Sequence, residues 1–184
     1  MYFLNTIGKI NMKKLLTMFV VLCCATQTMA RNNADNSISV FVLDESKTPT
    51  NVRETAGGKV AGTLPINETG HIVEIDECQK GWCSVIDIRE AGVDKEIKIK
   101  SKTGELWLHH SVLAFDTRNY GKQKITIRNK PQENAQTVYS FNDEKTLRLL
   151  DFNEEWVKVK TKNGKHTGWI ERKWVCENPL TTCP

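Results

Sequence analysis

Apolar and polar residues alternate along most of the chain beyond its first thirty residues. Clear examples are residues 71–75, 96–100 and 156–160, each of which is a period-two or β-branched run. A period of two places successive side chains on opposite faces of a β-strand. Asn163-Gly164 lies between two such runs and predicts a tight hairpin, because both residues tolerate positive φ. No segment of residues 31–184 keeps a helical period beyond two turns, so we predict an all-β fold.

Residues 1–30 follow a different pattern. Lys13 and Lys14 precede an apolar run over residues 15–25, and small residues end the segment at Ala30. This order is typical of a secretory signal, and the apolar run is too short for a comfortable membrane span. We therefore expect an exported protein, periplasmic or extracellular at the cell surface, with no integral membrane segment in the mature chain.

A lipid anchor at Cys23 or Cys24 is an alternative, although Leu22 is not the small residue expected before a lipidated cysteine.

The charges nearly balance outside this leader. The chain has 26 basic and 22 acidic residues, and three of the basic ones lie in the leader, namely Lys9, Lys13 and Lys14. A nearly neutral mature chain gives no reason to expect nucleic acid or an anionic membrane as a partner.

Four cysteines remain after the leader: Cys78, Cys83, Cys176 and Cys183. An even number in an exported protein predicts disulfides, and three pairings are possible. We favour Cys78–Cys83 with Cys176–Cys183, because each pair closes a short local loop. A zinc site would need all four thiolates to converge, and their spacings are not those of zinc ligands. No metal and no cofactor are therefore predicted.

Three sequence blocks recur in the same order in two halves of the chain. Residues 50–53, 81–85 and 106–113 correspond to residues 125–128, 155–159 and 168–175. Recurrence at matching spacing predicts two copies of one module. We place the copies at 38–116 and 124–184, with a polar joining segment at 116–123. An insertion near 89–102 should extend a hairpin of the first copy. Short strands in units of this size predict small barrels.

These blocks carry a family resemblance. Asn51-Val52-Arg53, then a Gly-Trp-x-x-Val strand at Gly81, then Gly168-Trp169-Ile170, resemble the bacterial SH3-like (SH3b) domain in tandem. The resemblance covers residues 38–176, and the second copy is the closer match because Leu106 replaces the usual glycine in the first. It implies two five-stranded barrels that act as binding or targeting modules. Such modules often accompany cell-wall peptidases and bind peptidoglycan or peptide segments in the cell envelope.

Strand parity and the resemblance together indicate a ligand groove in the second copy. Val157 and Val159 share one face, so Trp156 should point the other way. Residues 168–175 resemble the SH3 signature Gly-Tyr-Ile-Pro-Ser-Asn-Tyr-Val, which implies that Trp174 takes the place of the groove tyrosine and Glu171 that of the groove proline. Trp156 and Trp174 would then flank one pocket.

Other candidate groove residues are weaker. Tyr139, in the segment after Arg128, would form a further wall of the same pocket. In the first copy Trp82 remains and His109 stands at the proline position, but Val112 replaces the aromatic residue. We therefore expect the better groove in the second copy. The alternative is that Trp82 and Trp156 are covered by the neighbouring module or by a loop.

Several other residues are expected to be structural. Trp107 and Trp169 should pack in the core or against a hairpin. The recurring arginines, Arg53 and Arg128, are expected in ion pairs at strand ends.

No constellation of catalytic residues stands out. Adjacent His109 and His110 should point to opposite faces of a strand and so cannot readily share a metal ion. With the thiols paired, no free cysteine nucleophile is expected. We therefore predict a non-catalytic binding protein for peptidoglycan or a peptide. The alternative is an adaptor or inhibitor that binds another secreted protein through the insertion at 89–102, because long loops on rigid scaffolds often carry recognition.

Overall fold

The computed structural model describes residues 36–119 and 121–176 of the 184-residue chain. Within these residues the regular structure consists of β-strands with short 3₁₀ turns, so the predicted all-β class is confirmed. None of the helices in this part of the chain has the length and apolar character needed to cross a membrane. The predicted signal segment, 1–30, lies outside the described residues.

The strands of the first half follow one another with short connections. They are β1 (Ile38–Val42), β2 (Thr50–Arg53), β3 (Val60–Leu64), β4 (His71–Gln79), β5 (Trp82–Glu90), β6 (Lys95–Glu96) and β7 (Leu106–His109), followed by the 3₁₀ turn η3 (His110–Val112). The second half contains β8 (Leu113–Thr117), β9 (Ile125–Arg128), β10 (Thr137–Phe141), β11 (Thr146–Phe152), β12 (Trp156–Thr161), β13 (Thr167–Glu171), η4 (Arg172–Trp174) and β14 (Val175–Cys176).

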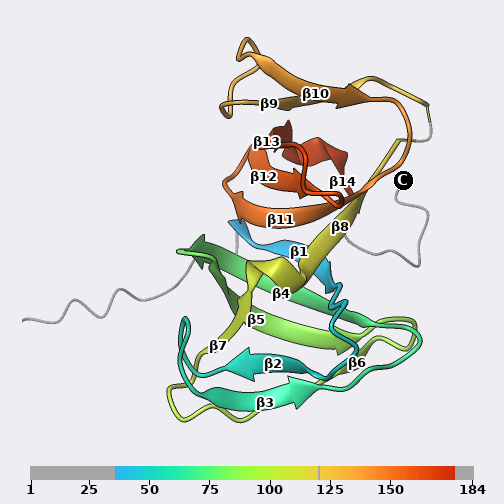
Figure 1. Cartoon of the computed structure of the whole chain (residues 1–184). Helices are drawn as coiled ribbons and strands as arrows, with labels where there is room; N and C mark the ends of the chain where they lie inside the picture. Colours follow the sequence, from blue (N-terminus) through green and yellow to red (C-terminus); the bar gives the residue numbers. More distant parts are fainter. Residues whose placement is uncertain (1–35, 120, 177–184) are drawn as a thin grey trace, which may run out of the picture. The chain divides into compact units, whose positions relative to one another are not determined.

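The two halves share one strand order (Figure 1). In the first half neighbouring strands run β1-β4-β5-β7-β2-β3, and in the second they run β8-β11-β12-β13-β9-β10. All of these pairings are antiparallel, as expected for strands joined by hairpins. The segment between the first and fourth strand of each half forms a hairpin of its own, β2–β3 or β9–β10, which adds strands to the five that were expected.

Strand β8 belongs to both halves. Its first residues pair with β1 (Val42 with Leu113), and its later residues pair with β11 (Phe115 with Leu147) and with β14. In the second half, β14 therefore pairs with the first strand, β8, as β8 pairs with the first strand of the first half, β1. Both faces of β8 are covered, because consecutive side chains from Leu113 to Phe115 are fully buried. The polar segment expected to join the modules therefore begins inside a shared strand, since Thr117 is also buried.

Alternation accounts for the core. Val73 and Ile75 of β4 are completely buried, while Glu74 between them is partly exposed. The buried side chains of both halves form one hydrophobic cluster, which includes Val40 of the first half and Val159 of the second. Burying a large aliphatic side chain is worth about 1.5–3 kcal/mol, so this cluster supplies much of the driving force for folding.

Two predicted local features are confirmed. The Asn163-Gly164 turn connects β12 to β13, with Gly164 at a φ of 73°. Cys78 and Cys83 form a disulfide between facing residues of β4 and β5. Cys176 is buried in β14, and its predicted partner Cys183 lies outside the described residues.

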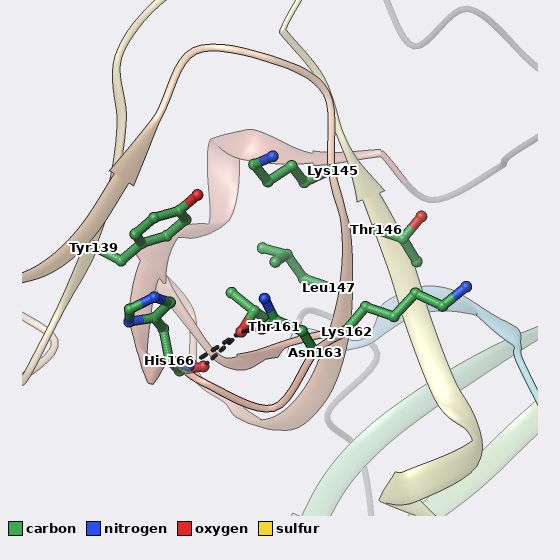
Figure 2. A pocket seen from close by; sticks show the side chains of 8 residues that line it. All are labelled: Tyr139, Lys145, Thr146, Leu147, Thr161, Lys162, Asn163 and His166. Atoms are coloured by element: carbon green, nitrogen blue, oxygen red, sulfur yellow. Dashed lines mark hydrogen bonds between the residues drawn. The ribbon is translucent and has the colours of Figure 1, made fainter.

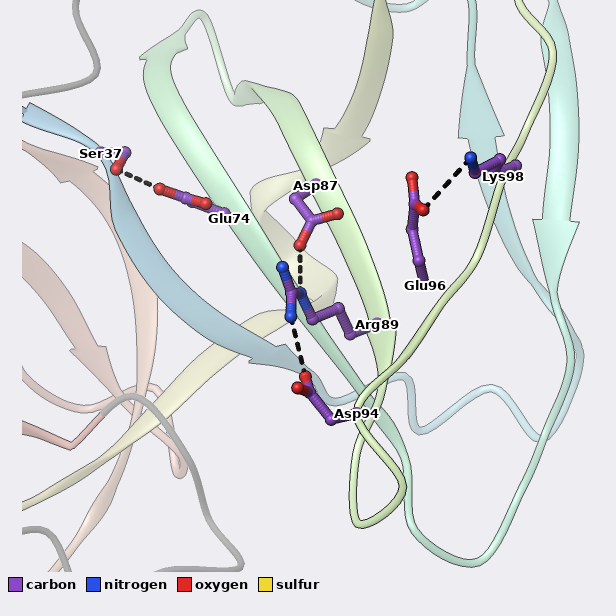
Figure 3. A network of polar contacts seen from close by, with 7 residues as sticks. All are labelled: Ser37, Glu74, Asp87, Arg89, Asp94, Glu96 and Lys98. Atoms are coloured by element: carbon purple, nitrogen blue, oxygen red, sulfur yellow. Dashed lines mark hydrogen bonds and ion pairs between the residues drawn. The ribbon is translucent and has the colours of Figure 1, made fainter.

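The insertion near 89–102 begins as a hairpin and then folds back on the sheet. β6 pairs with the end of β5, where Arg89 lies between two carboxylates, with its Nε 2.5 Å from Asp87 and its Nη1 3.0 Å from Asp94 (Figure 3). Beyond β6, Ile97 and Ile99 pack against the core. Much of the insertion is therefore fixed to the first half, and its tip is the exposed part.

Candidate functional site

A groove lies at one end of β12, where three segments of the second half meet. Its cavity has a volume of about 570 Å³ and is lined by Pro131, Gln132, Glu133, Glu154, Glu155, Trp156, Glu171, Arg172 and Lys173. We call it the Trp156 groove. The first three residues come from the β9–β10 turn, the next two from the β11–β12 turn, and the last three from the end of β13 and the start of η4.

Local hydrogen bonds hold these segments in place. The Asn153 side-chain oxygen accepts from the backbone N–H groups of Glu155 (3.0 Å) and Trp156 (2.8 Å), which fixes the β11–β12 turn. The backbone N–H of Arg172 donates to the carbonyl of Glu155 at 2.7 Å and ties this turn to η4. On the other wall, Arg128 Nη1 donates to the Ala135 carbonyl at 3.0 Å. The groove is therefore preformed by hydrogen bonds that fix the backbone of its three segments.

Trp156 forms the floor of the groove. Its residue is only 6% exposed, so it is not an open platform on the outer face of the sheet. Val157 beside it is also buried, and both faces of β12 are thus covered where the strand begins. Strand parity gave the direction of the side chain but could not show that the two flanking turns cover most of it.

The charges around the groove are predominantly acidic. Four glutamates and two cations line it, so the carboxylates are in excess. Lys173 forms an ion pair with Glu171. Arg172 donates to Asn36 Oδ1 at 3.1 Å and to the Ser37 carbonyl, and its guanidinium lies 6.0 Å from the centre of the Phe152 ring. A cavity with an aromatic floor and more carboxylates than cations is complementary to a cationic group.

Of the other predicted groove residues, Glu171 lines the groove and Trp174 does not. Glu171 faces Trp156 across the β12–β13 pair. Trp174 ends η4, is partly buried against the core, and is not among the residues that line the groove. Its carbonyl accepts from the backbone N–H of Arg118 at 3.0 Å. The expected Trp156–Trp174 pair is thus not assembled on this cavity, because the short 3₁₀ turn directs Trp174 inward.

Tyr139 lies in a second cavity of about 460 Å³, which we call the Tyr139 pocket (Figure 2). Its lining residues are Tyr139, Lys145, Thr146, Leu147, Thr161, Lys162, Asn163 and His166. The Tyr139 ring stacks on His166, with centroids 4.3 Å apart and planes 5° from parallel. Tyr139 therefore does not wall the Trp156 groove. Sequence reasoning missed His166, whose only signal was its place near the hairpin tip.

The first half has a tryptophan–histidine pair where the second half has the pair of Trp156 and Glu171. Trp82 faces His109 across the β5–β7 pair, just as Trp156 faces Glu171, which supports the predicted correspondence of the two positions. The Trp82 and His109 ring centroids are 5.0 Å apart in an edge-to-face contact, and the Arg53 guanidinium lies 5.4 Å from the Trp82 ring. Trp82 thus already has an aromatic and a cationic neighbour.

The expectations for the two recurring arginines and for the two adjacent histidines are wrong. Arg53 and Arg128 do not form strand-end ion pairs in the described part of the chain; each donates to a carbonyl of its own hairpin, Gly58 or Ala135. The rings of His109 and His110 do not point to opposite faces, because β7 ends at His109 and η3 starts at the next residue. Their centroids are 4.7 Å apart.

No cluster of three metal-ligating side chains occurs within residues 36–119 and 121–176.

Burial lowers the pKa of His110 below its usual value, and the neighbouring His109 acts in the same direction.

Comparison with known proteins places the Trp156 groove within a recognised domain type. Residues 124–175 match the family model described as "Bacterial SH3 domain". Among solved structures, NlpC1 and NlpC2 from Trichomonas vaginalis are similar to this chain at 12% identity and a TM-score of 0.29. The match covers 76% of this chain but 45% and 48% of those proteins, so this chain spans less than half of either. No curated protein matches the chain.

Proposed function

We propose that this chain is a non-catalytic binding protein of the cell envelope, and that the Trp156 groove binds an amino group of a peptide segment, including the peptide stems of peptidoglycan. The observation that carries this proposal is the composition of the groove, a nearly buried tryptophan floor under four glutamates. The match of residues 124–175 to the bacterial SH3 domain supports it, because the resemblance implies recognition of peptidoglycan or peptides.

An extracytoplasmic location is part of the proposal. The Cys78–Cys83 disulfide is typical of oxidising compartments, and the predicted signal at 1–30 would deliver the chain there. The similar placement of Trp82 and Trp156 supports a tandem of two bacterial SH3-like modules, of which the second carries the ligand site.

Calorimetric titration tests the proposed ligand class. We expect an acetylated, amidated peptide with a central lysine to bind the full chain more tightly than the same peptide with acetyl-lysine. Glu133→Gln should weaken binding by about tenfold, as expected for loss of one charge-assisted contact. Glu144→Gln is the matched control, because Glu144 is exposed and does not line the groove. Equal binding of both peptides would rule out the cationic ligand.

Pull-down on purified sacculi then separates a peptidoglycan stem from a free peptide. Retention of the wild type and loss of Glu133→Gln would support the stem. Lysine-dependent peptide binding without sacculus retention would support a free peptide instead. Hydrolysis of the sacculi by the purified protein would overturn the non-catalytic assignment.

The alternative, an adaptor or inhibitor of a secreted protein, rests on two exposed apolar side chains. Val93 at the tip of the insertion is 64% exposed, and Ile66 in the β3–β4 loop is 67% exposed. The two loops are joined, because the N–H of Ala91 donates to the Gly70 carbonyl at 3.1 Å. If this surface docks a partner, a protein that co-purifies with the wild type should be lost with the Ile66→Ser/Val93→Ser variant. Unchanged co-purification counts against the surface.

A further inference from the structure

The Tyr139 pocket is distinct from the Trp156 groove and has the opposite charge. Its lining contains two lysines, Lys145 and Lys162, and no carboxylate. Figure 2 shows Leu147 in the middle of the pocket, with the stacked rings of Tyr139 and His166 along one side. Leu147 is only 1% exposed, so the apolar surface open to a ligand is that of the stacked rings. An aromatic wall bordered by ammonium groups is suited to a side chain that has both a methylene stem and a carboxylate.

The hairpin on which His166 lies is fixed by its own hydrogen bonds. The backbone N–H of Thr161 donates to the His166 carbonyl at 2.9 Å, and the N–H of His166 donates to Thr161 Oγ1 at 3.1 Å. Thr161 Oγ1 also donates to Asn163 Oδ1 at 2.8 Å. Tyr139, from another strand, then stacks on this hairpin. The aromatic wall therefore needs little reorganisation to receive a ligand, which lowers the cost of binding.

The two lysines differ in availability. Lys162 Nζ lies 3.3 Å from Glu45, and this carboxylate also accepts from Arg148 at 2.8 Å. In Figure 2 Lys162 extends away from the stacked rings, whereas Lys145 lies beside the pocket on the side of Tyr139. Lys145 Nζ is 5.6 Å from the centre of the Phe141 ring, and that ring carries no charge to neutralise it. Lys145 is therefore the better placed of the two to meet an incoming anion.

A backbone edge runs beside the same pocket. Strand β10, which carries Tyr139, pairs only with β9 among the strands of the described residues. Its other edge can add an extended peptide as a further strand, in which alternate side chains would point the same way.

We propose that the Tyr139 pocket is a second ligand site that takes a glutamate or aspartate side chain of an extended peptide lying along β10. Lys145 pairs with its carboxylate, the Tyr139 ring contacts its methylene groups, and the β10 backbone binds the peptide chain. This site is separate from the proposed amine site, so either can be right without the other.

Titration of the full chain with two acetylated, amidated hexapeptides tests the proposal. One peptide has a glutamate flanked by valine and threonine, and the other has glutamine at that position. We expect the glutamate peptide to bind about tenfold more tightly, as for one charge-assisted pair. Lys145→Gln should abolish this preference, whereas Lys173→Gln, at the Trp156 groove, should preserve it. Unchanged far-UV circular dichroism would show that each variant is folded.

Amide chemical shifts locate the bound peptide. The proposal expects perturbations of residues 137–141, of Leu147 and of His166. It is overturned if the two peptides bind equally, if Lys145→Gln leaves the preference intact, or if the perturbed amides are those of residues 131–133 and Trp156. Tyr139→Ala provides a second variant: it removes the stacked wall and should weaken both peptides, because both contact the Tyr139 ring.

Discussion

Phe115 is the large apolar side chain at the centre of β8, and none of it is exposed. Its strand pairs with β1 of the first half and with β11 of the second. Replacing a buried phenylalanine by alanine removes apolar contacts and leaves a cavity, which costs about 3–5 kcal/mol. Because β8 is common to both halves, we expect Phe115→Ala to destabilise both of them together.

The size of the effect makes it measurable in urea. If the free energy of unfolding falls by about 2 kcal/mol per molar urea, a variant that loses about 4 kcal/mol of stability unfolds at a urea concentration about 2 M lower. The free energy of unfolding of native proteins is about 5–15 kcal/mol, so the variant should remain folded in buffer. Val138→Ala is the matched control: Val138 is exposed on β10 and its truncation should shift the midpoint little.

Native-state hydrogen exchange distinguishes the two halves. Amides of Val73 on β4 and Val159 on β12 report on the first and second half. A shared strand predicts that both lose protection in Phe115→Ala by a similar factor. Wild-type protection of one half, with loss confined to the other, would refute the idea that β8 couples them.

Other contacts give further predictions. The Cys78→Ser/Cys83→Ser variant should lose about 2 kcal/mol in chemical denaturation, because the unfolded chain is no longer constrained by its short loop. Burial lowers the folded-state pKa of His110 and of His71 below the usual value for histidine. As the pH falls below about 6.5 the unfolded chain therefore binds protons that the folded chain resists, and stability should decrease between pH 7 and pH 5. His110→Gln should reduce this slope, which thermal melts across the range can measure. Arg148→Met should lower the free energy of unfolding by about 1–3 kcal/mol, because the Leu43 carbonyl loses the guanidinium donor that it has in the wild type. Unchanged thermal stability would contradict this role.

Features determined by local sequence were predictable. Alternation identified the strands, and Asn163-Gly164 identified the hairpin between β12 and β13. The short separation of Cys78 and Cys83 favoured the disulfide that is present. These features depend on side-chain period, φ preference or chain length within a few residues, all of which can be read directly from the sequence.

The shared strand was not predictable from polarity. Asp116 and Thr117 were interpreted as the start of a joining segment, because polar residues are usual in linkers. In the structure both pair with β14, and the Thr117 hydroxyl accepts from the backbone N–H of Lys145 at 2.9 Å. Strand pairing and a side-chain hydrogen bond offset the cost of burying a threonine. Neither partner is close in sequence, so no local pattern indicated it.

Only part of the candidate site was predictable, because its other part depends on segments that are distant in sequence. Trp156 and Glu171 are cross-strand neighbours, and the repeat indicated their correspondence. The positions of Trp174 and Tyr139 depend on irregular backbone: η4 turns the first inward, and a shift in register between β10 and β9 precedes the second. Parity does not hold through a 3₁₀ turn or a bulge. The acidic lining contributed by residues 133, 154 and 155 emerges only when the two turns meet.

The most direct test of the central claim is a chemical-shift map of the full chain with the lysine-containing peptide. We predict that the resonances of the Trp156 indole and of the Glu133 and Glu155 amides shift on titration, and that those of Trp82 in the first half do not. Perturbations confined to the first half, or none at Trp156 at saturating peptide, would contradict the assignment of the Trp156 groove as the binding site.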